Sequence, residues 1–319
     1  MEGRLANSWR LTVNDKNFIK TALLSEIRID GRKPFEYLLI IMVIYREDGS
    51  SEVQLGQTRV MGMVTAQLVQ PYRDRPKEGI LSIFTEFSPM ADPSFEPGRP
   101  GELAVELGRI VDRGLRESRA VDTESLCILA GKFVWAIRID LHILDNGGCS
   151  YSVPINIFCG NRNLVDAANI AALAALLTFR RPECSLGGED GQEVIVHPPE
   201  IREPLPLTVH HLPIAISFGF FSNESILVID PTQNEEAVMG GRMTTTVNAN
   251  GDICAIQKSG GEGVPRRVIM QCLQLATSKA ASITKQIKDA VEVFNTERAL
   301  RKIKRHPTST GDDVREKQN

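Results

Sequence analysis

The clearest pattern of apolar and polar positions lies near the middle of the chain, in FVWAIRIDLHIL, residues 133–144. Apolar side chains alternate there with Arg138, Asp140 and His142. A period of two predicts a strand with one buried and one exposed face. Three further runs are apolar and β-branched, are separated by polar turns, and predict more strands of the same sheet: 37–45, 58–72 and 80–87.

A different period governs residues 101–118, which predict an amphipathic helix after a Pro/Gly-rich loop. On a helical wheel its apolar side chains gather on one side, and Arg109, Arg113 and Arg116 lie nearly opposite. These arginines can form a solvated face with salt bridges such as Asp112–Arg116, each worth about 0.2–0.5 kcal/mol. They can also form a phosphate-binding ridge, because a guanidinium fork matches phosphate oxygens. The residues alone favour the solvated face.

Residues 164–179 are rich in Ala and Leu on every side, which predicts a helix buried between layers rather than an amphipathic one. Asn163 and Asp166 form a capping-box-like pair at its start. A helix N-terminus binds anions well, because its free N–H groups and its dipole favour negative charge. The acid in this first turn raises the question of whether the helix holds an anion at all.

The second half of the chain opens after a polar, Pro-rich link at residues 197–207. Two apolar strands are predicted to pair across SNES, and a hairpin is predicted to turn at Asn250–Gly251. A long helix with one apolar stripe follows. We therefore predict a polar lead-in, two modules and a charged, disordered tail: 1–30, 31–197, 207–296 and 297–319.

Residues 149–162, CSYSVPINIFCGNR, interrupt the first module. Without them a strand would join the buried helix through a short glycine turn, and with them the connection exceeds the usual length of such loops. We therefore expect an insertion that loops out of the fold, is weakly ordered and belongs to no site.

Composition places few limits on function. The net charge of −3 means that contact with nucleic acid would need a local basic patch. Six cysteines without a CxxC pair favour reduced thiols over a zinc site, and no cofactor or metal is expected. We also expect no membrane span and no secretion signal. Walker, GxSxG, HExxH and GxGxxG motifs are absent, so a nucleotide hydrolase or a Ser hydrolase has no support.

Two acids, Asp230 and Glu236, lie around a turn in DPTQNEEA. Paired carboxylates can act as general acid and base or hold a divalent ion. They can equally belong to an ordinary turn, in which Asp230 accepts backbone hydrogen bonds before Pro231. The residues alone favour the turn.

Several motifs together resemble one family: RIDGR, SSEVQLGQTRVMGMVTAQLV, FEPGRPGE, ELGRIVDRGLRES, VDTESLCILAG, WAIRIDLHILDNGG, NLVDAANIAALAALLTFRRPE, VIDPTQNEEAVM and NGDICAIQKSGG. The series resembles the RNase PH-like subunits of the eukaryotic RNA exosome core. The resemblance implies an α+β RNase PH fold, in which two related βα modules of the ribosomal protein S5 domain 2-like type pack together. It also implies a six-membered ring of such subunits, S1- and KH-domain cap proteins, single-stranded RNA as ligand, and a place in the nucleus, its nucleolus and the cytoplasm.

The same resemblance implies a meaning for the acid in the buried helix. Active, phosphate-using members carry a cation at the start of this helix, where Asn163 and Asp166 stand here. A carboxylate in place of a guanidinium turns attraction for phosphate into repulsion, of about 4 kcal/mol at about 4 Å in an effective dielectric of about 20. We therefore expect a degenerate phosphate site. Active members also carry two acids after a later strand, of which Asp230 is kept and Glu236 is the second, a vestigial pair.

The resemblance further implies that inactive subunits of this family contribute basic side chains to a shared RNA path, which favours RNA contact over a solvated face for these arginines. We expect some of four residues to line that path: Arg99, Arg109, Arg113 and Arg116. The expected function is a non-catalytic ring subunit that supports 3'-to-5' RNA processing and degradation, including ribosomal RNA maturation and turnover of messenger and noncoding RNA. The alternative is an active phosphate-dependent 3'-to-5' exoribonuclease that uses the two acids named above. A third hypothesis is a free-standing RNA-binding protein.

Overall fold

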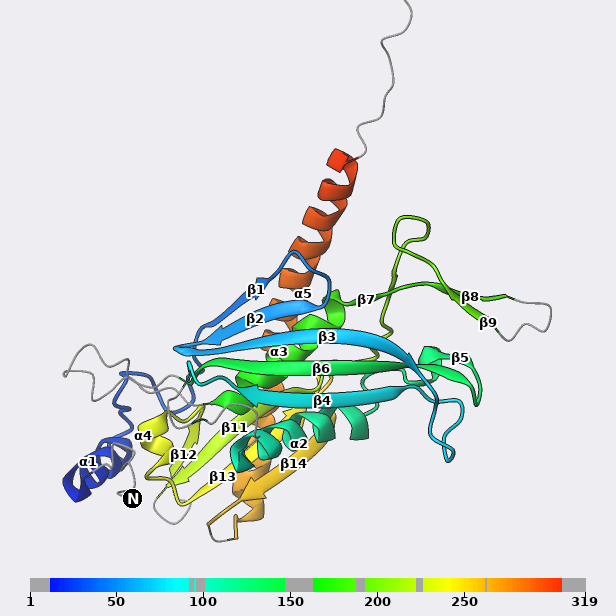
Figure 1. Cartoon of the computed structure of the whole chain (residues 1–319). Helices are drawn as coiled ribbons and strands as arrows, with labels where there is room; N and C mark the ends of the chain where they lie inside the picture. The colour runs from blue at the N-terminus through cyan, green and yellow to red at the C-terminus, as the bar shows by residue number, and fades with distance from the viewer. Residues whose placement is uncertain are drawn as a thin grey trace, which may run out of the picture.

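The computed structural model describes residues 12–91, 95, 101–146, 163–187, 193–221, 226–261 and 263–305. Two β-sheets form separate layers, a helix lies between them, and further helices flank this arrangement (Figure 1). Within the described residues, no helix is long and apolar enough to cross a membrane. The predicted insertion at 149–162 lies outside them, and so does Arg99.

The first sheet comes from the first half of the chain. Its strands are β1 (Ile40–Ile44), β2 (Ser50–Leu55), β3 (Thr58–Val69), β4 (Ile80–Phe87), β5 (Cys127–Leu129) and β6 (Phe133–Asn146). Their order is β1-β2-β3-β6-β4, with β5 also paired to β6. Neighbours are antiparallel except β4, which runs parallel to β6. The alternation predicted for β6 is confirmed, since its odd-numbered residues from 137 to 143 are buried whereas Arg138 is exposed.

The second sheet is fully antiparallel. Its strands are β11 (Ile214–Phe221), β12 (Ile226–Ile229), β13 (Gly241–Val247) and β14 (Ile253–Ser259), in the order β12-β11-β13-β14. The predicted hairpin joins β13 to β14. Gly251 has a φ of +91°, a conformation that glycine adopts without strain. The side-chain oxygen of Asn248 accepts hydrogen bonds from the N–H groups of Asn250 and Asp252, which stabilises this turn.

Helix α3 (Leu164–Thr178) lies between the two sheets, and all of its residues except Leu177 are buried. Small side chains let it approach the first sheet closely. A Cβ atom added at Gly62 on β3 would lie 2.9 Å from the carbonyl oxygen of Ala171. The prediction of a helix that is buried on every side is therefore confirmed.

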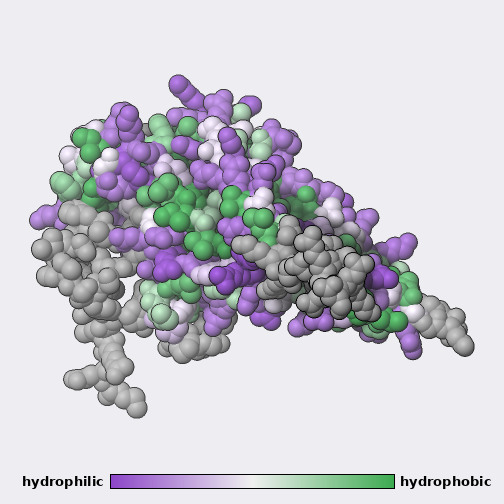
Figure 2. All heavy atoms as spheres, turned by 90° about the horizontal axis from the view of Figure 1, so that it is seen from above, coloured by the Kyte–Doolittle hydropathy of each residue, from purple (hydrophilic) through white to green (hydrophobic). Residues whose placement is uncertain are grey.

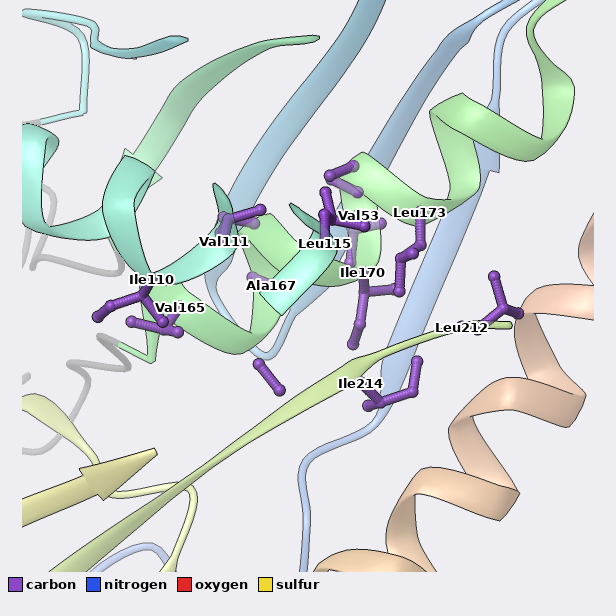
Figure 3. Close-up of a cluster of buried hydrophobic side chains, with 14 of the residues drawn as sticks. Val53, Ile110, Val111, Leu115, Val165, Ala167, Ile170, Leu173, Leu212 and Ile214 are labelled. Atoms are coloured by element: carbon purple, nitrogen blue, oxygen red, sulfur yellow. The ribbon is translucent and has the colours of Figure 1, made fainter. Parts of the chain in front are cut away.

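Two longer helices complete the core. Helix α2 (Glu102–Glu117) packs against β4, α3 and β14, and helix α5 (Arg266–Arg305) packs against β11, β13, α3 and β1. Figure 3 shows side chains of α2, such as Val111 and Leu115, close to Ile170 of α3, with Ile214 of β11 beyond them. One continuous cluster of buried apolar residues therefore spans both halves of the chain. Leu103, which the helical wheel places with the apolar side chains of α2, is 45% exposed.

The remaining elements are short. They are α1 (Val13–Leu24), η1 (Glu124–Leu126), β7 (Arg180–Arg181), β8 (Cys184–Gly187), β9 (Glu193–Val196), β10 (Leu205–Pro206) and α4 (Gln233–Glu236). β10 lies near the end of the predicted link between the modules, residues 197–207, and pairs with β7. The link is therefore attached to the first module there.

The prediction of a disordered tail from residue 297 is wrong for residues 297–305, because α5 continues to Arg305. This part of the helix has partners in the first module. Arg298 forms a 2.7 Å ion pair with Asp48, in the turn between β1 and β2. The contact joins residues 250 positions apart, so a pattern read along the helix alone does not reveal it.

Candidate functional site

The start of α3, where the sequence predicts a degenerate phosphate site, has no face open to solvent. Asn163 caps the helix, and its side-chain oxygen accepts a hydrogen bond from the N–H of Asp166 at 3.4 Å. Asn163, Leu164, Val165 and Asp166 are all buried. The side chain of Asp166 reaches Ser217 of the second module, as well as partners in the first module.

Asp166 accepts hydrogen bonds from three separate segments. Its Oδ2 atom accepts them from the Tyr37 hydroxyl at 2.9 Å, the Asn163 amide at 2.7 Å and the Ser217 N–H at 3.1 Å. Its Oδ1 atom accepts one from the Ser217 hydroxyl at 2.8 Å. Ser217 lies on β11, and Tyr37 precedes β1. This one carboxyl group therefore joins α3, the entry to the first sheet, and the second sheet.

Asp230, at the end of β12, belongs to the same network. It is 1% exposed and has a left-handed φ of +53°, which costs about 1–3 kcal/mol for a residue other than glycine. Its Oδ1 accepts a hydrogen bond from the Asn163 amide at 2.8 Å. Its Oδ2 accepts bonds from Arg32 at 2.7 Å and from the N–H of Leu38 at 3.2 Å. The Asn163 amide group thus bridges Asp166 and Asp230.

A buried ion pair lies beside Asp230. The Arg28 guanidinium donates to both carboxylate oxygens of Glu235, at 2.9 Å and 2.5 Å. It also donates to the carbonyl oxygens of Ile229 and Asp230, at 3.0 Å and 2.9 Å. Glu235 is 1% exposed, whereas Glu236, its neighbour on α4, is partly exposed. The structure therefore brings Glu235 to this arginine, one residue before the acid that the sequence pattern singles out.

Burial dominates the electrostatics of the network. Burial, and then the charge of Asp230, raises the pKa of Asp166 from 3.8 to about 7, against the opposing effect of the hydrogen bonds from Asn163 and Ser217. Burial and the charge of Asp166 also raise the pKa of the Tyr37 hydroxyl well above its ordinary value, so this group remains a donor. Burial alone would lower the pKa of Arg32, but Asp230 and Asp30 outweigh it and raise that pKa.

The arrangement leaves little chemistry open to these acids. Every carboxylate oxygen of Asp166 and Asp230 already accepts a hydrogen bond within the chain, and both side chains are buried. Neither acid therefore presents an oxygen to a metal ion or to a substrate proton from solvent. In the described part of the chain, no group of three or more His, Cys, Asp and Glu side chains is placed to hold a metal ion.

The predicted arginines of α2 lie on its exposed face but differ in their contacts. Arg113 forms an ion pair with Glu117 at 3.0 Å, and Arg116 forms one with Asp112 at 2.8 Å. Arg116 also donates to the Leu81 carbonyl on β4 at 2.8 Å. Arg109 makes no ion pair with any described residue, although it lines an open groove between α2 and β4.

Five residues of the network were not identified from the sequence: Arg28, Arg32, Tyr37, Ser217 and Glu235. Arg28 and Arg32 lie in RIDGR, a motif that carries the family resemblance, but no periodicity marks them as buried. Ser217 lies in the apolar run IAISFGFF, where a lone hydroxyl among apolar neighbours is the available signal. Each of them meets a partner far away in the chain, which only the fold reveals.

Comparison with known proteins identifies the family of both modules. The family described as "3' exoribonuclease family, domain 1" matches residues 37–182, and its domain 2 matches residues 211–279. A solved structure described as the Archaeoglobus fulgidus exosome with RNA bound to the active site is similar, with a TM-score of 0.70 and 31% identity, over 86% of this chain and 97% of that one. The RNase PH fold predicted from the motifs is therefore confirmed.

Relatives that match most of this chain identify the group within the family. Exosome complex component RRP45A of Arabidopsis thaliana is 66% identical over 98% of both chains, and RRP45B of the same plant is 69% identical over 98% of this chain and 68% of its own length. Human exosome complex component RRP45 is 42% identical over 87% of this chain, which spans 60% of that protein. The chain therefore belongs to the RNase PH family of 3' exoribonuclease domains, in the group of the exosome complex components RRP45.

Proposed function

We propose that this chain is a non-catalytic subunit of an RNA exosome, in which RNase PH-like chains form a six-membered ring that carries S1- and KH-domain cap proteins. The assembly would process and degrade RNA from the 3' end, in the nucleus, its nucleolus and the cytoplasm. The relatives that carry this argument are named exosome complex components, and one similar solved structure is described as an archaeal exosome core.

One observation carries the non-catalytic part of the proposal. Asp230, the buried member of the acidic pair, and Asp166, at the expected degenerate phosphate site, are committed to hydrogen bonds that hold the two modules together. A phosphate ion at the start of α3 would have to displace Ser217 or Tyr37 from a buried carboxyl group, which would leave that group without donors. Side chains of the chain itself thus fill the site, and Asp166 repels an anion there whenever it is ionised.

The contribution to RNA binding comes from the exposed face of α2. Arg109 and Arg113 are exposed there, and guanidinium groups bind the phosphates of a single strand without reading its sequence. Arg116 is a weaker candidate, because Asp112 and the Leu81 carbonyl already engage it. Arg99, expected in the loop before this helix, stays a candidate from the sequence alone.

Catalysis is tested with RNA, inorganic phosphate and Mg²⁺, with the chain alone and with the chain assembled with RNase PH-like subunits. The proposal expects no release of nucleoside diphosphate from the chain alone, and the same rate from assemblies that contain the parent chain or Asp230→Asn. Product release by the parent chain that disappears in Asp230→Asn would instead support the alternative, an active exoribonuclease that uses Asp230 and Glu236.

RNA binding is tested separately, in the assembled complex. The double substitution Arg109→Gln and Arg113→Gln should weaken binding of single-stranded RNA and reduce its salt dependence, because two phosphate contacts are lost. Arg267→Gln is the matched control, since Arg267 is also an exposed helical arginine but lies on α5. Equal binding by all three proteins would remove α2 from the RNA path.

A further inference from the structure

An open groove runs between β4 and α2, at one edge of the first sheet (Figure 1). It has a volume of about 370 Å³, and its charged lining residues are Arg109, Asp112 and Arg116. Asp112 and Arg116 pair with each other at 2.8 Å, and Arg116 also donates to the Leu81 carbonyl. Arg109 is exposed and forms no ion pair with any described residue. Among the described lining residues, Arg109 is therefore the cation that is open to a ligand.

A phenylalanine ring borders the same groove. Phe84 of β4 lines it and is 50% exposed. The register pairs Phe84 with Asp140 of β6, so its side chain lies on the outer face of the sheet and not in the core. The Arg138 guanidinium of β6 lies over the ring, with its central carbon 4.2 Å from the ring centroid. The ring therefore contacts a cation on the β6 side and borders the groove on the α2 side.

The position of this guanidinium is fixed by its own partner. Arg138 Nε donates to both carboxylate oxygens of Asp140, at 2.8 Å and 3.1 Å. A cation over one face of an aromatic ring is attracted by the negative charge of that face. The Phe84 ring is thus supported from behind and is presented to the groove with little freedom left to lose, which favours binding of a flat ligand.

We propose that this groove is a nucleotide subsite on the path of single-stranded RNA, in which one base stacks on the Phe84 ring and a neighbouring phosphate pairs with Arg109. The inference rests on the proposed function and deepens it. The exposed arginines of α2 account for contacts to phosphates, and Phe84 adds a contact to a base.

The chemistry of the groove favours a nucleotide over a protein segment. Unpaired bases stack on aromatic side chains, and a guanidinium binds the adjacent phosphate. The lining combines one aromatic ring with more cations than acids, and the small residues Ala104 and Gly108 form its α2 side. Figure 2, which views the molecule from above, shows a different kind of surface, with apolar side chains gathered near the middle of that face. An apolar patch suits contact with another protein.

The test measures RNA binding by the assembled complex with the full chain carrying Phe84→Leu, which removes the aromatic face and keeps an apolar side chain. We expect the dissociation constant of a short oligoadenylate to rise about tenfold, because a base stack is lost. Its salt dependence should stay that of the parent, because no phosphate contact changes. Phe18→Leu is the matched control, since Phe18 is 59% exposed on α1. Equal binding by Phe84→Leu and the parent, or equal loss in the control, would overturn the proposal.

Oligoadenylates with a single abasic nucleotide test the stack from the side of the RNA. When the abasic nucleotide is moved along the strand, we expect one position at which the parent assembly loses about tenfold in affinity and the Phe84→Leu assembly loses nothing further. Losses from the variant and from the abasic nucleotide that add at every position would show that no base stacks on Phe84.

The outcomes separate this inference from the proposed function. Binding that weakens with Arg109→Gln and Arg113→Gln but not with Phe84→Leu would overturn the subsite and leave the RNA path on α2 standing. Absence of RNA binding by the parent assembly would overturn both. Failure of Phe84→Leu to assemble, when Phe18→Leu assembles, would show that a protein occupies the groove, and the nucleotide subsite would again be overturned.

Discussion

At the scale of single residues, the central feature is a buried acid, Asp166, which has a structural role at the position where the family resemblance implies a cation in active members. Asp166 is buried without an adjacent guanidinium, and burying a carboxylate in this way is costly unless it is hydrogen-bonded or neutralised. Both occur here: the Tyr37 and Ser217 hydroxyls and the Asn163 amide donate to it, and its pKa rises to about 7. The group therefore carries a proton for much of the time below neutral pH.

This raised pKa predicts how stability depends on pH. Because the pKa of Asp166 is higher in the folded chain than in the unfolded one, its contribution is fully present below about pH 4 and is lost as the pH rises towards 7. In Asp166→Asn the side chain cannot lose a proton. Between these pH values the free energy of unfolding should therefore fall less steeply in Asp166→Asn than in the parent, by up to about 1.4 kcal/mol per pH unit.

Urea denaturation at a series of pH values measures this difference. Asp289→Asn, which removes an exposed acid on α5, serves as the control and should keep the slope of the parent. Parallel curves for the parent and Asp166→Asn would show that Asp166 does not take up a proton on folding in this range.

A second residue-scale prediction concerns the Arg28–Glu235 ion pair. Both side chains are buried, so Arg28→Met leaves a carboxylate buried without its main donor and should cost about 3–5 kcal/mol. Arg202→Met breaks the exposed ion pair with Glu183 and should cost no more than about 1 kcal/mol. Denaturation midpoints of the two variants measure the contrast, and similar losses would contradict the structural role given to Arg28.

At the scale of elements, the helix α3 depends on small residues that let it lie against the first sheet. In Gly62→Ala the new methyl group would lie 2.9 Å from the Ala171 carbonyl, and backbone on both sides leaves it little room to move. We expect a loss of about 1–3 kcal/mol in the free energy of unfolding. Gly263→Ala, where no atom lies within 4 Å, should change it by less than about 1 kcal/mol. A Gly62→Ala chain as stable as this control would mean that the approach of α3 is looser than described.

Elements with a strong local period could be predicted from the sequence, and elements held by distant partners could not. The alternation of β6, the apolar sides of α3 and the turn at Asn250–Gly251 each depend on residues within a few positions of one another. The end of α5 depends on Arg298 and Asp48, which are far apart in the chain, and its charged composition therefore predicted disorder instead.

At the scale of the whole molecule, the two modules share one apolar core and one buried hydrogen-bond network, which we call the polar joint. The core passes through α3, and the joint connects Tyr37, Asp166, Ser217 and Asp230. The sequence identified Asp166 and Asp230 but not that Asn163 bridges them, because that contact needs the start of α3 and the end of β12 to meet. For the same reason it identified Glu236, on the pattern of relatives, whereas the buried acid next to Arg28 is Glu235.

The hydrogen bonds between the two modules and the proposed lack of catalysis have one common cause: side chains of the chain itself occupy the start of α3, where the family resemblance implies a phosphate site in active members. Isothermal titration of the purified chain with inorganic phosphate tests this most directly. The account predicts no saturable heat at millimolar phosphate, because the start of α3 is buried and its acid already has all its donors from within the chain. Saturable binding of one phosphate per chain would contradict it.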